Sequence, residues 1–511
     1  MVTRASDYSL AAASGVLLAL SFPKFGHPAF GWIALAPLLV AVARGGPLSR
    51  ALRLGLLTGV LYFTGTLYWI TGVMATYGHL QTWVAVLVNA ALIAYLALFP
   101  ALFAVVMRRL VAANGPPALM AAPLVWVATE LGRTHLLTGF PWVLLGYSQV
   151  PVLPIAQLAS IFGVYGVSAL VAAVSASAAV VAVSRDRTTR LRAVVSVALP
   201  LILVAAWGSV RASSAEWTRA GQPIRVGLIQ GNVEQSEKWE IERSRAIFDD
   251  YIRMTRQAIA AGAELVIWPE SSTPFLFEED LPAAARVRAI AREARVPILL
   301  GSDHIEWRID GNRRIPDKFF NSAFMVRPDG TTAGPYRKMH LVPFGEYVPL
   351  KKLLFFAGPL VEQVGPFSAG EEATLLPVAG HQVSTAICYE VVYPNLVRQF
   401  VLGGSELLTT ITNDAWFGPT SAPYQHFAQA SMRAIEEGRY LVRSANTGIS
   451  GIVDPYGRVL EQSAVYQQVV VVGEARFLNV STFYTRHGDI LAYASVVLTL
   501  VLLLASRRRV Q

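Results

Sequence analysis

The chain has 511 residues, of which 54% are hydrophobic and 15% charged, and its mean hydropathy is +0.45. This composition excludes a wholly soluble globule. The formal net charge is +9, but much of the excess is arginine placed between apolar segments, as topogenic charge is, so it does not indicate nucleic-acid binding.

Apolar segments long enough to span a bilayer crowd roughly the first two hundred residues and recur at the C-terminal end. The first segment resembles a signal peptide in length, but others follow it closely, so we predict an uncleaved helix. Pro100 predicts a kink or an end in the fourth segment, and Glu130 is an ionisable residue near the end of the fifth. We predict about eight spans, centred near Val16, Ala36, Tyr62, Ala91, Val125, Ala169, Leu201 and Val497.

The arginines between these segments predict the orientation of the chain. The short loops on the other side carry little beyond Lys24 and Arg133. By the positive-inside rule, both termini are expected in the cytoplasm and the region 220–485 outside it. The arginines on the predicted cytoplasmic side are Arg4, Arg44, Arg50, Arg53, Arg108, Arg109, Arg185, Arg187, Arg190, Arg192, Arg507, Arg508 and Arg509.

We therefore predict three regions: a membrane domain of about seven spans at 1–215, an extracytoplasmic catalytic domain at 220–485, and a last span with a cytoplasmic tail at 488–511. Strand and helix patterns alternate in the middle region, which favours an α/β fold. The expected strands are Ile224–Gln230, Glu264–Trp268, Pro297–Gly301, Ser322–Val326, Val383–Ile387, Leu407–Thr412 and Gln468–Gly473, and the expected helices are Arg243–Ala261, Ala283–Ala294 and Gln425–Glu437.

Cys388 is the only cysteine, so neither an intramolecular disulfide nor a thiol-based metal cluster can form. A free thiol outside the cytoplasm is prone to oxidation, which suggests that it has a function. The alternative is a small buried side chain. Cys388 follows the expected strand 383–387 and precedes a helix-like stretch near Pro394–Leu402, as a residue in a nucleophile elbow does.

Two further segments supply ionisable partners for that thiol. Glu270 ends an apolar strand in Trp-Pro-Glu, where desolvation would raise its pKa and suit it to act as a base. Lys338 follows the turn-like segment Pro328–Pro335, where its ammonium could lower the thiol pKa and stabilise an oxyanion. Taken singly, such a glutamate is usually a solvated loop residue, and such a lysine usually belongs to a charged face.

Glu270 in W-P-E, Lys338 in Y-R-K-x-H-L-V-P-F-G-E and Cys388 in I-C-Y-E, in this chain order, resemble the Glu-Lys-Cys triad of the nitrilase superfamily. The resemblance implies an αββα sandwich. It also implies Glu270 as general base, Lys338 as transition-state stabiliser and Cys388 as nucleophile. Because apolar segments bracket the domain, the resemblance narrows to the membrane-embedded branch of that superfamily, the apolipoprotein N-acyltransferases, and covers essentially the whole chain.

The same resemblance implies accessory or substrate-binding residues around the triad. Four segments carry this part of the resemblance: Gln230–Trp239, Phe344–Pro349, Asn413–Gly418 and Arg443–Gly448. The last of them is equally well explained as a plain strand and turn. The accessory residues are Trp239, Glu346, Tyr389, Glu390, Asn413, Trp416 and Arg443.

What the resemblance implies for function is N-acyl transfer from a phospholipid, through a Cys388 thioester, to the α-amino group of a diacylglyceryl apolipoprotein. It implies the bacterial inner membrane, a periplasmic catalytic domain and no metal or cofactor. Residues 348–360 are mostly hydrophobic yet include two lysines, which suggests a membrane-facing lid or a packed surface helix. A membrane-tethered amidase or acyl hydrolase and an inactive scaffold are the alternatives; the complete triad disfavours the scaffold.

Overall fold

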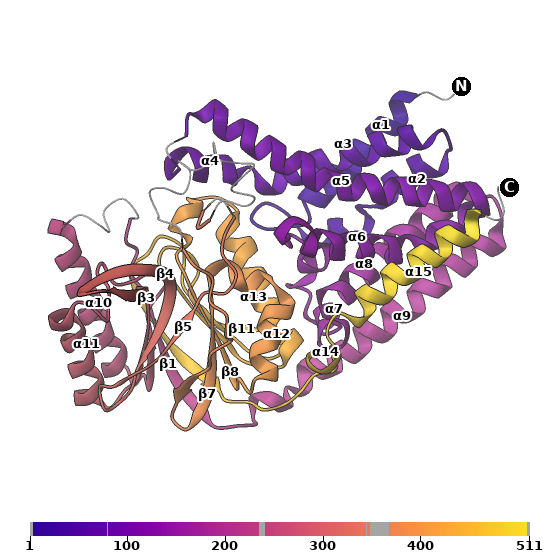
Figure 1. Ribbon diagram of the computed structural model, residues 1–511. Helices are drawn as coiled ribbons and strands as arrows, with labels where there is room; N and C mark the ends of the chain where they lie inside the picture. Colours follow the sequence, from indigo (N-terminus) through magenta and orange to yellow (C-terminus); the bar gives the residue numbers. More distant parts are fainter. Residues whose placement is uncertain (1–3, 79, 235–240, 344, 348–366, 508–511) are drawn as a thin grey trace.

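A computed structural model describes residues 4–78, 80–234, 241–343, 345–347 and 367–507 of the chain. Figure 1 shows a bundle of helices, built from the two ends of the chain, beside a layered α/β region built from its middle. The predicted lid at 348–360 and Trp239 lie outside the described residues.

Two six-stranded sheets form the α/β region. The first has the order β12-β1-β2-β3-β4-β5 and the second β11-β10-β9-β8-β7-β6. Strands β1, β2 and β3 are parallel to each other, as are β7, β8 and β9, and the outer strands are antiparallel. The bounds are β1 Pro223–Gln230, β2 Leu265–Ile267, β3 Ile298–Asp310, β4 Arg313–Val326, β5 Thr332–Arg337, β6 Leu376–Val378, β7 His381–Ile387, β8 Leu407–Thr412, β9 Leu441–Ala445, β10 Gly451–Val453, β11 Val459–Gln462 and β12 Val469–Arg476.

Helices cover the outer face of each sheet, which gives the expected αββα sandwich (Figure 1). Helices α10 (Ile241–Ala260) and α11 (Leu281–Ala294) pack on the first sheet, and α12 (Pro394–Leu402) and α13 (Ala422–Glu437) on the second. Strand β2 shows why the layers form. Leu265 and Ile267 face the core between the sheets, whereas Val266 faces the outer helices. A strand buried on both faces must be apolar throughout.

Each of the seven expected strands and three expected helices coincides with an observed element. The turn-like segment 328–335 is partly wrong, because β5 already begins at Thr332. Strands β3 and β4 extend well beyond the expected ranges, as a long hairpin whose outer half is largely exposed and polar. Hydropathy alone therefore identified only the buried half of each strand.

Every predicted span centre falls within a helix of the bundle. Within the described residues, three helices are long and apolar enough to cross a membrane, or four if the pair α3 and α4, bent by 54°, is one span. The predicted count of about eight is therefore not established. The helices of the bundle are α1 Arg4–Ala19, α2 Ala36–Ala43, α3 Leu48–Leu67, α4 Trp69–Thr76, α5 Thr82–Asn114, α6 Ala122–His135, α7 Leu153–Ala156, α8 Ala159–Val183, α9 Arg187–Ser214, α14 Phe483–His487 and α15 Ile490–Arg507.

Two sequence features of the bundle acquire clear roles. Helix α5 continues through Pro100 to Asn114, so the helix does not end there. Glu130 accepts a hydrogen bond from the backbone N–H of Leu145 at 2.7 Å. Arg133 donates to the carbonyl of Trp142 at 2.6 Å. Both side chains are buried and pin the loop after α6 into one conformation.

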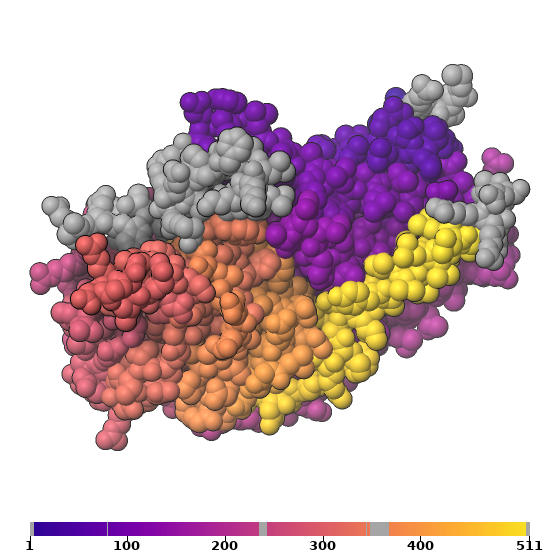
Figure 2. Space-filling view, viewed as in Figure 1, coloured from indigo at the N-terminus to yellow at the C-terminus, as the bar shows by residue number. Residues whose placement is uncertain are grey.

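The bundle and the sandwich share buried polar contacts, and Figure 2 shows the two in contact on the face drawn. Trp142 Nε1 donates to Gln425 Oε1 at 2.7 Å, and the N–H of Val164 donates to Glu436 Oε1 at 2.8 Å. Both acceptors lie on α13, so this helix is the main structural link between the bundle and the second sheet.

Candidate active site

Cys388 lies at the sharp turn that the sequence predicts. It follows β7 and begins a short 3₁₀ helix, Cys388–Val392, with a φ of 52°. A non-glycine residue in this region is uncommon and marks a constrained turn. Burial raises the pKa of the thiol above its ordinary range, and Glu270 adds to this, whereas Lys338 acts in the opposite direction. The resting group is therefore a neutral thiol that needs a base.

That outcome corrects one expectation. Lys338 does favour the thiolate, but burial and the Glu270 carboxylate outweigh it, so the net pKa of Cys388 rises. How completely the fold buries the thiol could not be predicted from the residues around Cys388.

Lys338 follows β5 directly and is only 1% exposed. Its backbone N–H donates to the Asn321 carbonyl at 2.9 Å, and its Nζ lies 2.8 Å from Glu346 Oε1 and 3.4 Å from Glu270 Oε1. Burial opposes the charge, but the two carboxylates hold the pKa of Lys338 above its ordinary range. A buried ammonium between two carboxylates is thus a fixed positive charge.

Glu270, beyond the end of β2, is held at both carboxylate oxygens. Oε1 accepts a hydrogen bond from Asn321 Nδ2 at 2.7 Å, and Oε2 accepts one from the backbone N–H of Asn413 at 2.8 Å. Asn321 Nδ2 also lies 3.2 Å from Glu346 Oε1. One amide therefore links the two carboxylates that flank Lys338.

Glu390 is close to Cys388 in the sequence, but structural hydrogen bonds occupy its carboxylate. It accepts from the Tyr336 hydroxyl and the Met339 N–H, both at 2.7 Å, and from the Ile387 N–H at 2.7 Å. Burial raises its pKa to about 7, against these hydrogen bonds. Glu390 therefore ties the turn at Cys388 to the turn at Lys338, a role the sequence did not distinguish from substrate binding.

Residues after β8 complete this side of the site. The Asn413 side chain accepts a hydrogen bond from Asn446 Nδ2 at 3.0 Å. Arg443, on β9, is fully buried and donates to Asp414 Oδ2 at 2.9 Å. Of the two explanations for its segment, a buried structural role fits the geometry.

Aromatic rings from the bundle reach the nucleophile. Trp142 stacks on Tyr389 at 6.4 Å between ring centroids and also contacts Trp69 and Phe417. Trp416 packs edge-on against Tyr77 of the bundle at 5.0 Å. The predicted Tyr389 and Trp416 therefore lie where the sandwich meets the bundle, and an apolar acyl chain suits such surroundings.

Four residues of this site were not predicted: Asn321, Asp414, His426 and Trp142. Asp414 lies inside the segment Asn413–Gly418, and Asn321 directly precedes the predicted strand Ser322–Val326. Their nearness to these segments is the signal by which the sequence could have indicated them. His426 and Trp142 are distant from Cys388 in sequence, and nothing in their local pattern connects them to it.

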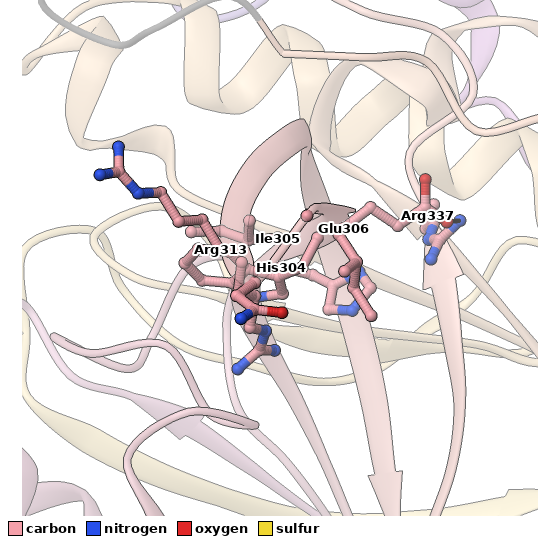
Figure 3. A pocket seen from close by; sticks show the side chains of 10 residues that line it. His304, Ile305, Glu306, Arg313 and Arg337 are labelled. Atoms are coloured by element: carbon pink, nitrogen blue, oxygen red, sulfur yellow. Dashed lines mark ion pairs between the residues drawn. The ribbon is translucent and has the colours of Figure 1, made fainter.

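A pocket of about 590 Å³ opens at the outer β3–β4 hairpin, where Figure 3 shows its lining. Two of its arginines are paired: Arg337 lies 2.7 Å from Glu306, and Arg314 lies 2.9 Å from Glu279 just outside. Glu270, Lys338 and Cys388 do not line it. Among the described residues, no group of three His, Cys, Asp or Glu side chains is arranged to hold a metal ion.

Comparison with known proteins agrees with this architecture. The family model for the apolipoprotein N-acyltransferase N-terminal domain matches residues 14–177, and the carbon-nitrogen hydrolase model matches 225–475. The apolipoprotein N-acyltransferase of Geobacter metallireducens is 43% identical over 98% of this chain and 96% of its own length. That of Methylococcus capsulatus is 35% identical over 94% and 92%.

Among solved structures, an amidase from Nesterenkonia sp. is 21% identical and has a TM-score of 0.38, with 54% of this chain and 97% of the amidase covered. The carbon-nitrogen hydrolase match and the two six-stranded sheets identify the fold of the middle region. The relatives that match over nearly their full length identify the family of the whole chain. This chain belongs to the apolipoprotein N-acyltransferase family.

Proposed function

We propose that the chain is an N-acyltransferase that moves a fatty acyl group from a membrane phospholipid to the α-amino group of a diacylglyceryl apolipoprotein. The family supports the reaction type. The observation that carries the residue assignments is the buried Glu270–Lys338–Glu346 group, in which the charges of Glu270 and Lys338 act on the thiol of Cys388.

In the first half-reaction, Glu270 takes the proton from the Cys388 thiol as Sγ attacks the carbonyl carbon of the phospholipid ester. Lys338 and backbone N–H groups stabilise the oxyanion. When the tetrahedral intermediate collapses, the C–O bond breaks and Glu270 returns the proton to the leaving alkoxide. The products are a lysophospholipid and an acyl thioester on Cys388.

In the second half-reaction, the apolipoprotein amine attacks the thioester carbonyl. Glu270 takes a proton from the attacking amine, the C–S bond breaks, and the proton passes to the departing Cys388 sulfur. The product is an amide, and the thiol is regenerated. No step requires a metal or a soluble cofactor, since the proton only moves between Glu270 and the reacting atoms.

The bundle gives this chemistry access to lipid. An amidase acting on small amides needs no membrane part, whereas a phospholipid ester lies at the bilayer surface with its chains below it. The stack of Trp142 on Tyr389 supports the proposal, because it brings the bundle to the residue next to the nucleophile. We further propose a bacterial inner-membrane location, with the sandwich in the periplasm and both termini in the cytoplasm, on the arginine distribution.

Trp239, which lies outside the described residues, keeps its expected role as a proposal: it contacts substrate. Glu346, whose Oε1 lies 2.8 Å from Lys338 Nζ, is proposed to position that lysine and to act mainly when the acceptor amine binds.

Mass spectrometry of the intact protein tests the proposal and separates it from the acyl hydrolase. Wild type incubated with phospholipid micelles alone should gain one acyl mass on Cys388 and hold it until a diacylglyceryl peptide is added. Cys388→Ala should gain none. Steady release of fatty acid without acceptor would indicate the hydrolase, and absence of any adduct on wild type would refute the triad assignment.

A further inference from the structure

The carbonyl of Cys388 is held by a side chain that the mechanism does not use. The ladder between β7 and β8 ends at the pair Ile387 and Ile411, one residue before the nucleophile. The carbonyl of Cys388 then lies 3.2 Å from Nε2 of His426, on α13. His426 is fully buried, so this contact is not shared with solvent.

The contact fixes the proton on the imidazole. A carbonyl oxygen only accepts, so Nε2 of His426 must be the donor. Nδ1 lies 3.1 Å from Asp414 Oδ1 and 3.0 Å from Arg443 Nη2. The neutral ring can accept from Arg443 through Nδ1, and a charged ring can donate to Asp414. Nε2 carries a proton in both states.

Asp414 is itself held rigidly. Besides Arg443, it accepts from the Thr412 hydroxyl at 2.8 Å. A Cβ added at Gly448 would lie 2.1 Å from Asp414 Oδ2, so the backbone at Gly448 closes on this carboxylate. The network thus reaches the nucleophile at its carbonyl, through His426.

The imidazole ring is packed as well as hydrogen-bonded. Its centroid lies 5.4 Å from Trp142 and 5.8 Å from Phe417. Trp142 belongs to the bundle, and Phe417 follows β8. The ring therefore has no room to turn, and its Nε2–H has a fixed direction.

We propose that His426, oriented by Asp414 and Arg443, is a positioning residue that holds the Cys388 carbonyl and thereby keeps the positive φ of the nucleophile. This inference rests on the proposed function in taking Cys388 as the nucleophile. A turn with a positive φ persists only where its surroundings enforce it. Loss of this hydrogen bond should let the peptide after Cys388 rotate and move Sγ away from Glu270 and Lys338.

Two substitutions of equal charge separate this role from space filling. In His426→Gln the amide nitrogen reaches the position of Nε2 and can still donate to the Cys388 carbonyl. In His426→Asn the shorter amide stays near Nδ1, beside Asp414 and Arg443, and cannot reach the carbonyl. His426→Phe, a third variant, keeps the packing against Trp142 without any donor and leaves Asp414 paired with Arg443.

The rate of thioester formation from phospholipid is measured for each variant, with Ser431→Ala as control. Ser431 is buried on the same helix, and its hydroxyl donates only to the Phe427 carbonyl, at 2.8 Å. We expect His426→Asn and His426→Phe to acylate about ten- to a hundredfold more slowly than wild type, as small misplacements of reacting groups do. His426→Gln should recover most of that loss, and Ser431→Ala should match wild type.

Iodoacetamide provides a second readout that needs no lipid, because Cys388 is the only cysteine and labelling reports it alone. The same order, with Gln faster than Asn and Phe, is expected. Equal rates for Gln and Asn, or a wild-type rate in Phe, would overturn the positioning role. If wild type forms no thioester, the proposed function fails, and the alkylation order still decides the role of His426.

Discussion

At the scale of single residues, the two carboxylates on Lys338 differ in what else holds them. Glu270 is fixed by the side-chain amide of Asn321, which Glu346 shares, and by the backbone N–H of Asn413, which directly follows β8 of the second sheet. Glu346 binds the backbone N–H of Val342 at 2.7 Å, within its own loop. Glu270 is therefore anchored to the rigid sandwich, whereas Glu346 belongs to the segment around Lys338.

This difference predicts separate effects on the two half-reactions. Glu270→Gln keeps the size of the side chain but cannot take a proton, so thioester formation should fall by about a hundred- to ten-thousandfold. Glu346→Gln keeps a hydrogen-bond acceptor for Lys338, so some thioester should form and then stall before transfer to the amine.

Trapping the acyl-enzyme by mass spectrometry, with phospholipid and no acceptor, measures the first half-reaction in each variant. Adding a diacylglyceryl peptide then measures the second. Wild-type acylation in Glu270→Gln together with a failure in Glu346→Gln would show that the two roles are reversed.

The triad could be proposed from sequence because each member lies just beyond a strand and within a recognisable motif. His426 could not, because its relation to Cys388 depends on how α13 lies across the second sheet. Asn321 was missed for a related reason. The predicted strand began at Ser322, whereas the buried half of β4 begins at Phe320, so the polar Asn321 was left one residue outside.

At the scale of elements, α13 connects the nucleophile to the bundle. Its first turns hold Gln425 and His426, and its last turn holds Glu436 and Glu437. Glu437 is fully buried; its Oε2 accepts from Thr485 at 2.9 Å, and its Oε1 has no hydrogen-bond partner among the described residues. Burial raises the pKa of Glu437 to about 7.

The raised pKa predicts a pH-dependent contribution to stability. The folded carboxyl binds its proton more tightly than the unfolded one, whose ordinary pKa is 4.5. Its contribution is therefore complete below pH 4.5 and is lost as the pH rises through about 7. Glu437→Gln removes this titration, so at pH 8 the variant should be more stable than wild type, by on the order of 1–3 kcal/mol.

Thermal unfolding in detergent at pH 5 and pH 8 makes the comparison. The midpoint of Glu437→Gln should fall less than that of wild type between the two values. Glu461→Gln, on the exposed strand β11, should behave as wild type. A variant that loses as much stability as wild type between pH 5 and pH 8 would argue against a protonated Glu437.

Three of the described strands that the sequence did not indicate share a physical reason. Strands β5, β6 and β11 form sheet edges, and β5 and β6 contain Pro335 and Pro377, whereas β9 and β10 were missed although they lie inside the second sheet. Proline is tolerated at an edge, because no neighbour requires its missing N–H. Edge strands also lack the buried apolar run that identifies β7 and β8, so their pattern looks like a turn or a loop.

At the scale of the whole molecule, hydropathy located the helices but could not count the spans. The chain turns by 54° between α3 and α4, and α1, α6 and α15 have 16, 14 and 18 residues. An average of hydropathy over a window detects apolar residues but not the bends and ends of the helices that contain them. It also cannot tell lipid-facing segments from those buried against other helices, such as α8, where 61% of the apolar window is buried.

The arrangement of the helices nevertheless supports the predicted orientation. Asp7, near the start of α1, pairs with Arg44 and Arg50, and Arg108 donates to the Gly46 carbonyl at 2.8 Å. Arginines from two separate connections are thus gathered at one end of the bundle. The first turns of α1 and the end of α15 lie on the side away from the sandwich (Figure 1).

Reporter fusions test this orientation with one helix as an internal comparison. Helix α9 has an apolar window of which only 17% is buried, as expected for a lipid-facing span, and it separates Arg190 from Gly221. A reporter inserted after Arg190 should therefore read cytoplasm, and one near Gly221 should read the opposite side, because the arginines near the start of α9 resist translocation. A reporter after Arg109 should agree with the one after Arg190. If the fusion at Gly221 reads cytoplasm, the sandwich would lie inside the cell, away from lipoproteins exposed on the outer side, and the proposed acceptor would be wrong even if Cys388 still forms a thioester.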